Sequence, residues 1–363
     1  MKFRVGVIRE VCLAGLLVCL TGCGIEAAAP EAGAQAGKGA GAVARPARVV
    51  LVWPTPNQAF ARGEAVEAFL QPTASGRASS GGFGSVRNGG RRFHEGLDLK
   101  PVGRDAKGEA TDTIFAAMAG VVRHISDRPG ASNYGRYVVL EHPKESPPVY
   151  TLYAHLADIA SGITVGREVD AGAALGVMGR STSGEPIPKE RAHLHFEIGV
   201  RITDAFAGWY RERGFGSANT QGLWNGMNLA GIDPLEVFTW AREGRLRALD
   251  EVFAATPSAV TVRVANAAVP DFVKRYPSLA AGGMKGVNGN GAGWEIGFAV
   301  SGAPIRWRRL EAKDLIGYKR GEVRVVSVDQ EVLRENPARK LARAAKGGYV
   351  PGEDVETILG QLF

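Results

Sequence analysis

The chain has 363 residues, of which 45% are hydrophobic and 22% charged, an ordinary composition for a globular protein with room for two folded units. The formal net charge is +7, and loss of residues 1–22 would leave +5, because that segment carries three positive side chains and one negative one. This mild excess fits a protein that works near anionic lipids or wall polymers. The sequence has no nucleic-acid-binding motif, so no nucleic-acid partner is expected. The three cysteines, Cys12, Cys19 and Cys23, lie near the N-terminus, which excludes an internal disulfide or a thiol nucleophile in the processed protein.

The first residues have the pattern of an export signal. Lys2, Arg4 and Arg9 precede an apolar run at 11–20, which is too short to span a bilayer comfortably. The run ends in Leu20-Thr21-Gly22-Cys23, which resembles the lipobox of bacterial lipoproteins, where cleavage falls before the cysteine and the cysteine is acylated. We therefore expect residues 1–22 to be a lipoprotein signal peptide and Cys23 to be the lipidation site. The alternative is an ordinary cleaved signal with a cysteine nearby.

Residues 23–47 consist almost entirely of Ala, Gly and Pro with scattered charges. Such a segment cannot bury enough apolar surface to fold, so it predicts a tether between the lipid and the next domain. Gly24 is not the aspartate that signals inner-membrane retention. We therefore expect an exported protein that is lipid-anchored to the cell envelope, on the outer membrane facing the periplasm if the cell has two membranes.

Residues 48–250 predict a mostly β domain. Short runs of apolar and β-branched residues are separated by Gly- and Pro-containing turns, which favours an antiparallel sheet over alternating strands and helices. Residues 201–232 predict an irregular excursion, after which Asp233 and Pro234 are typical of the start of a helix, expected to reach about Arg247. The expected strands are 93–99, 114–117, 120–125, 137–141, 149–155, 174–178 and 193–200.

Residues 258–363 predict a small C-terminal α+β domain of unknown role. Strands are expected at 260–264, 294–300, 305–310 and 323–328, and helices near 337–345 and 354–362. Trp294, Trp307 and Tyr318 are candidates for the ligand face of a wall-binding module, although such residues are more often core edges and solvated surface. The predicted fold class is mostly β, an antiparallel β-sheet domain followed by this smaller α+β domain.

Two short segments suggest a metal site. His94 and Asp98 are four residues apart, and His193 and His195 are two apart, so each pair would share one face of an extended strand. Gly96 would leave the shared face of the first pair clear. If the strands lie side by side, three or four metal-seeking groups meet, and imidazole nitrogens with one carboxylate suit Zn²⁺.

Other titratable residues are sorted by the same reasoning. His155 ends a hydrophobic strand and can converge on the same point, whereas His124 and His142 are expected to be structural. Glu95 and Glu197 are left out of the site, on the expectation that they point away from the ligand face if both segments are regular strands.

The motif core at 93–200 resembles the M23 (LytM/lysostaphin-type) zinc endopeptidases. Three motifs of that family occur here in order: Phe-His-Glu-Gly-Leu-Asp at 93–98, Tyr-Ala-His-Leu at 153–156 and His-Leu-His-Phe-Glu at 193–197. Gly-Ile-Asp-Pro at 231–234 matches a segment often found just after the family's core. In the family a Gly-x-Ser-Thr-Gly-Pro turn usually leads straight into His-x-His, whereas residues 185–192 intervene here and are expected to lengthen a loop at the rim of the groove.

The resemblance implies the roles of five residues. It makes His94, Asp98 and His195 the ligands of one Zn²⁺ per chain, with water in the fourth position, and His155 and His193 the catalytic histidines beside that water. It implies a lipid-anchored zinc endopeptidase that hydrolyses peptide cross-links or stem peptides of bacterial peptidoglycan, with peptidoglycan peptides and the membrane as partners. Because some LytM-like domains have lost ligands, the alternative is a non-catalytic activator of cell-wall amidases or a wall-binding lipoprotein.

Overall fold

The computed structural model describes residues 49–363, so the expected signal peptide, the tether and Cys23 lie outside the described residues. The described residues, 49–363, belong to one compact unit. The division of this unit into a domain at 48–250 and another at 258–363 stays a prediction. Within residues 49–363, every helix is too short or too polar to cross a membrane.

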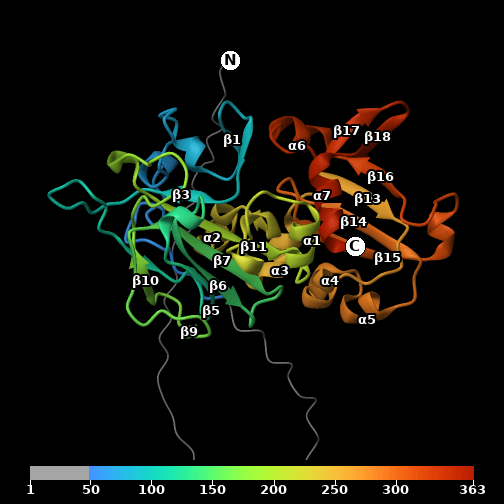
Figure 1. The fold of residues 1–363 in the computed structure, drawn as a ribbon, viewed down its shortest axis with the longest axis horizontal. Helices are drawn as coiled ribbons and strands as arrows, with labels where there is room; N and C mark the ends of the chain where they lie inside the picture. Colours follow the sequence, from blue (N-terminus) through green and yellow to red (C-terminus); the bar gives the residue numbers. More distant parts are fainter. Residues whose placement is uncertain (1–48) are drawn as a thin grey trace, which may run out of the picture. The chain divides into compact units, whose positions relative to one another are not determined.

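An antiparallel sheet of seven strands forms the centre of the first part of this unit (Figure 1). Its strands follow the order β12-β11-β7-β6-β5-β9, and β3 also pairs with β11. The mostly β, antiparallel fold predicted for this part is therefore confirmed. The strands are β3 (Leu97–Leu99), β5 (Gly120–Ser126), β6 (Arg136–His142), β7 (Val149–Leu156), β9 (Glu168–Val169), β11 (Leu194–Arg201) and β12 (Leu229–Ile232).

Strand β11 separates two buried clusters by the alternation of its side chains. Leu194, Phe196, Ile198 and Val200 are fully buried in the main apolar core. His195 lies opposite Ala154 of β7, which belongs to a second buried cluster on the other face, together with Tyr137 and Tyr150. Because successive side chains of a strand point to opposite faces, His195 and Glu197 are held on this second face. One strand therefore supplies both a core and a polar site.

The sequence predicted one continuous strand at 93–99, and this is wrong: the segment forms two short strands. β2 (Arg92–His94) pairs with β1 (Gly84–Arg87), and β3 pairs with β11. Between them, a Cβ on Gly96 would lie 2.1 Å from the carbonyl oxygen of Phe196. The glycine is therefore required by the close approach of two backbones rather than by the need to clear a ligand face. A sheet of three short strands joins β4 (Thr113–Phe115), β10 (Ala174–Val177) and β8 (Asp158–Ile159).

The stretch 201–232 is more regular than its sequence suggested. It contains α1 (Phe206–Glu212) and ends in β12, whose pairing with β11 depends on a partner about 30 residues away in sequence. The expected helix after it is α2 (Pro234–Arg242), capped by Asp233, which accepts a hydrogen bond from the Leu235 amide. This helix ends short of Arg247, because Gly244 adopts φ +70° and leads into a separate helix, α3 (Leu249–Ala255).

A second antiparallel sheet, of four strands, lies in the C-terminal part (Figure 1). Its order is β15-β14-β13-β16, and the strands lie close to the expected ranges: β13 (Val260–Val264), β14 (Gly293–Phe298), β15 (Pro304–Leu310) and β16 (Val323–Val328). The helices of this part are α4 (Asp271–Arg275), α5 (Gly283–Asn288), α6 (Gln330–Glu335) and α7 (Glu353–Leu362). Single 3₁₀ turns occur at Val66–Ala68, Ala78–Gly81, Pro129–Ala131, Lys189–Arg191, Gly222–Trp224, Gly226–Asn228, Pro277–Leu279 and Ala312–Leu315.

The helix predicted near 337–345 is wrong. Residues Ala342–Ala345 form strand β17 of a hairpin with β18 (Gly348–Pro351). Gly347 and Gly348 both have positive φ, and this tight turn brings the two strands together. Helix propensity in the Ala- and Lys-rich stretch before the turn is overridden by this pairing. The last helix, α7, occupies the range expected for it.

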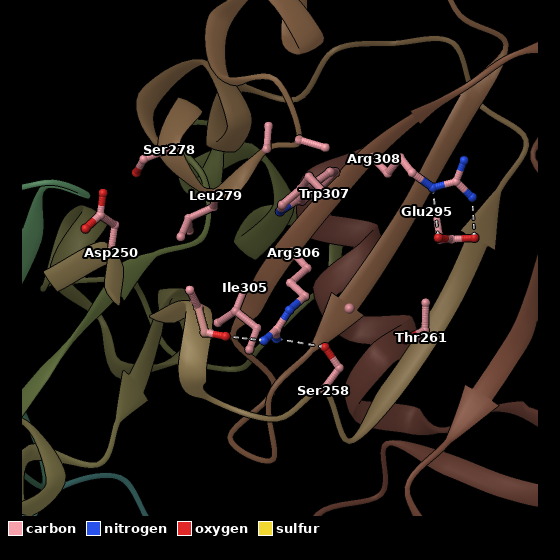
Figure 2. A pocket seen from close by; sticks show the side chains of 14 residues that line it. Asp250, Ser258, Thr261, Ser278, Leu279, Glu295, Ile305, Arg306, Trp307 and Arg308 are labelled. Carbon is pink, nitrogen blue, oxygen red and sulfur yellow. Dashed lines mark hydrogen bonds and ion pairs between the residues drawn. The ribbon is translucent and has the colours of Figure 1, made fainter. Parts of the chain in front are cut away.

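Trp294 and Trp307 do not form a surface. They are 0% and 2% exposed, and their rings meet edge to face at 5.5 Å. A cavity of about 460 Å³ lies beside Trp307 (Figure 2). The arginines around it already have partners, because Arg306 donates to the Thr256 carbonyl and Ser258, and Arg308 pairs with Glu295. Trp294 and Trp307 therefore belong to the core of this sheet rather than to an exposed ligand face.

Candidate metal centre

His94, Asp98 and His195 converge on one buried point from three strands, β2, β3 and β11. His94 Nε2 lies 3.1 Å from Asp98 Oδ1 and 3.0 Å from His195 Nδ1, and His195 Nδ1 lies 3.2 Å from Asp98 Oδ1. The three residues are 1%, 3% and 5% exposed. Antiparallel register is the cause, because it sets His195 directly opposite Asp98. Two imidazole nitrogens and one carboxylate oxygen so arranged are a donor set that fits Zn²⁺.

The hydrogen bonds of the two histidines leave a different nitrogen of each facing this point. His94 Nδ1 donates to the carbonyl oxygen of Gly82, at 2.7 Å, so its lone pair is on Nε2. His195 Nε2 donates to the carboxylate of Glu197, at 2.9 Å, so Nδ1 is the nitrogen whose lone pair a metal would use once its proton has left. Each lone pair is thus directed by a partner on the far side of the ring, as is usual for metal-binding histidines.

Glu197, left out by the sequence reasoning, is part of the site. It is 1% exposed and also accepts hydrogen bonds from the hydroxyls of Tyr134 and Tyr150, at 2.6 and 2.7 Å. Burial alone would raise the pKa of Glu197, but the bonds from His195 and the tyrosines hold it below the ordinary value. The signal was available in the sequence, because residues two apart in a regular strand share a face. Glu95, by contrast, pairs with Arg339 at 3.4 Å.

The protonation states of the three converging residues follow from burial and from their neighbours. Burial lowers the pKa of His94 to about 4, which leaves this ring neutral at pH 7. Burial would raise the pKa of Asp98, but the nearby His193, His94 and Arg87 hold it well below the ordinary value. Against burial, hydrogen bonds to Asp98 and Glu197 raise the pKa of His195 to about 9. A metal ion must therefore displace a proton from His195 to bind.

His155 and His193, the two histidines that the resemblance makes catalytic, lie beside the three converging residues. Their rings lie 4.8 Å apart, and His193 Nε2 is 3.5 Å from Asp98 Oδ1. His155 Nδ1 donates to the Ser181 carbonyl and His193 Nδ1 to the Arg191 carbonyl, so each ring keeps a lone pair on Nε2. Burial lowers the pKa of both rings. The backbone of His155 has φ +62°, an unusual conformation for a residue with a side chain.

The other two histidines of the described chain hydrogen-bond to residues outside the converging group. His124 hydrogen-bonds Gln221 at 2.8 Å, and His142 bonds the Ala119 carbonyl and Thr151. Neither belongs to the group formed by His94, Asp98 and His195.

Arg87 is a second residue that the sequence reasoning missed. Its Nη2 lies 2.7 Å from His94 Nε2 and also contacts Asp98 Oδ2. Because His94 Nε2 has a single lone pair, the guanidinium and a metal ion compete for it. Arg87 lies on β1, and this strand is held from the C-terminal part, where Asn336 accepts a hydrogen bond from the Ser85 amide at 3.1 Å. The donor set fits zinc when Arg87 turns away from Nε2.

The site opens into a cavity of about 460 Å³, which we call the site cavity. Residues 185–192, which lengthen the loop before His193, form part of the cavity wall. Glu185, Ile187 and Arg191 of this loop line the cavity. Arg180 pairs with Glu109 at 2.9 Å and donates to the Ile187 carbonyl, which ties this loop to the domain. The remaining wall includes Tyr134 and His155, whose ring centroids lie 5.6 and 5.9 Å from that of His195.

Residues 92–205 match the model of peptidase family M23. The chain therefore contains a peptidase M23 domain, and its buried His94, Asp98 and His195 fit the metal site of a metallopeptidase. No curated protein matches the chain.

Several solved structures are similar to part of the chain. One is a protein described as a glycyl-glycine endopeptidase, lytM, from Ruminococcus gnavus (24% identity, TM-score 0.29, 44% of this chain and 51% of that one). Others are a zinc-containing peptidase from Vibrio cholerae (24%, 0.28, 42% and 37%) and the catalytic domain of lysostaphin from Staphylococcus simulans (20%, 0.25, 42% and 82%). The chain spans about half or less of the first two, so the family assignment of residues 92–205 rests on the family match.

Proposed function

We propose that the protein is a lipid-anchored zinc endopeptidase that hydrolyses peptide cross-links or stem peptides of bacterial peptidoglycan. The observation that carries this proposal is the convergence of His94, Asp98 and His195 next to two neutral histidines at the wall of a cavity. A metal-binding group without the two extra histidines would support metal binding alone, whereas the five together have the parts that hydrolysis needs.

His94 Nε2, Asp98 Oδ1 and His195 Nδ1 would hold the zinc and leave a position open. Zinc bound there would polarise a scissile carbonyl and lower the pKa of a bound water towards about 7. A neutral His155 or His193 accepts the proton of the attacking water at Nε2, and the ring that is protonated stabilises the oxyanion by a hydrogen bond. Glu197 is not the base, because its carboxylate already accepts bonds from His195 and two tyrosines on the far side of the ligand ring.

The substrate and the location in this proposal come from the sequence. A lipobox-like segment ending at Cys23 supports anchoring at the envelope, where peptidoglycan peptides are the abundant peptide polymer. The second candidate is a non-catalytic activator of cell-wall amidases. The complete set of five residues favours the enzyme, because such an activator has no need for them.

The test is digestion of purified peptidoglycan by zinc-loaded protein that begins at Pro46, with products identified by mass. This fragment holds the whole compact unit. We expect peptide-bond cleavage that a chelator abolishes and that zinc restores, and no cleavage by His195→Ala. Absence of cleavage by a protein shown to contain zinc would contradict the enzyme and favour the activator.

A further inference from the structure

A second cavity, of about 480 Å³, lies next to the site cavity and is called the outer cavity here. Arg92, Glu95, Asn133 and Tyr134 line both cavities. Since the same four side chains line both, the two cavities are adjacent, and we call the pair the groove.

The far wall of the outer cavity comes from the C-terminal part of the chain. Asp354, Thr357 and Ile358 line it from α7, and their spacing places them on one face of that helix. On other faces of α7, Val355, Leu359 and Leu362 are buried in the core. One helix, α7, therefore lines the groove with one face and is held in the core by its other faces.

Direct contacts hold this wall against the peptidase domain. Gln361 Nε2 of α7 donates to the Met227 carbonyl at 2.9 Å. Arg339 lies over the ring of Phe93, 4.4 Å from its centroid, and is 3.4 Å from Glu95. The segment around Arg339, about 240 residues away in sequence, thus contacts both neighbours of His94 in the chain. The C-terminal part therefore lies beside the candidate metal centre.

The lining of the outer cavity suits an extended peptide with charged groups of both signs. Arg92 is exposed and has no ion-pair partner among residues 49–363, and Asp354 contributes a carboxylate to the opposite wall. Leu229 and Ala230 of β12 also line the cavity, and β12 is the end strand of the main sheet order. A strand at the end of a sheet can pair with the main chain of an extended ligand.

We infer that α7, Arg339 and β12 form a peptide-binding extension of the metal site, which holds the arm of the substrate peptide that lies away from the scissile bond. This inference rests on the proposed function for the identity of the peptide. It assigns to the C-terminal part a direct role in substrate binding.

The test compares Thr357→Trp, which fills the outer cavity, with Glu356→Trp, which places the same side chain on the exposed face of the same helix. The probe is a fluorescently labelled, cross-linked peptidoglycan peptide dimer, and its binding is measured by anisotropy. We expect Thr357→Trp to weaken binding about tenfold or more and Glu356→Trp to leave it unchanged. Arg92→Ala should also weaken binding. Because it shortens an exposed side chain and leaves the packing intact, a loss of binding in this variant is not explained by misfolding.

Kinetics then separate this inference from the proposed function. In a parent protein that cleaves the dimer, Thr357→Trp should raise KM with kcat and zinc content unchanged. If the parent binds but does not cleave, the proposed function fails, while weaker binding by Thr357→Trp and Arg92→Ala still supports the extension. Equal binding of the dimer by the parent, Thr357→Trp and Arg92→Ala overturns the inference, whether or not cleavage occurs.

Discussion

Glu197 Oε1 and His195 Nε2 are 2.9 Å apart, and this hydrogen bond fixes which nitrogen of His195 faces the candidate metal centre. The carboxylate sits two residues along β11 from the ring that it orients, and two tyrosine hydroxyls hold it in place. A ligand ring positioned in this way does not lose rotational freedom when the metal binds, which favours high affinity.

Replacing Glu197 tests this arrangement. Glu197→Ala should weaken zinc binding by about 10–100-fold, because His195 loses the acceptor that orients its ring. The measurement is competition for zinc against a coloured chelator. Glu197→Gln keeps an acceptor oxygen, so a smaller loss is expected there. Zinc affinity in Glu197→Ala equal to that of the parent would contradict the role of this residue.

The four site histidines should separate into two groups. His195→Ala should abolish zinc binding and activity together, since it removes one of three ligands. His155→Ala and His193→Ala should keep one zinc per chain and lose about 10²–10⁴-fold in kcat, because they move a proton rather than hold the metal. Metal analysis and turnover on the same samples check this. Normal turnover by His193→Ala would rule out its assigned role.

Arg87→Ala should bind zinc about tenfold more tightly than the parent. The substitution removes a positive charge and a hydrogen-bond donor from the lone pair of His94 that the metal needs. Arg91→Ala, on the exposed end of the same hairpin, is the matched control. Weaker zinc binding in Arg87→Ala would show instead that the guanidinium supports the site by orienting Asp98.

Asp233→Asn should stabilise the fold at neutral pH. Burial raises the pKa of Asp233 to about 6, so between about pH 4 and pH 6 the folded state holds a proton that the unfolded state has lost. The contribution of Asp233 to the free energy of unfolding is therefore greatest below about pH 4 and falls as the pH rises through about 6. Asparagine keeps the helix cap without the charge, so the free energy of unfolding should rise by about 1–2 kcal/mol at pH 7. An equal gain at pH 4, measured by urea denaturation, would contradict this reason.

The anchor is tested separately from the site. Cys23→Ser should move the protein from the membrane fraction to the soluble fraction, because acylation needs the thiol. The parent and variant are compared by fractionation of cells and by mass of the processed N-terminus. Unchanged membrane association would reject the lipoprotein interpretation.

Short-range patterns were enough for much of the fold. Alternation of apolar residues located most strands, and the pair of Asp233 and Pro234 marked the start of α2. The histidines and Asp98 were also recognisable, since their spacing is a property of the strand that carries them. These features depend on residues close in sequence, because the fixed alternation of side chains along a strand determines which residues share a face.

Other features depend on contacts between distant segments, which no local pattern records. Strand β12 and the break at Gly96 each require a partner elsewhere in the chain. Arg87 reaches the lone pair of His94 because a hairpin folds over it, and α7 lines the groove because Gln361 meets the Met227 carbonyl. Residue type and spacing were therefore sufficient to recognise a metal site in this protein, whereas the neighbours of that site follow from long-range packing, whose free energy is gained only when the whole unit folds.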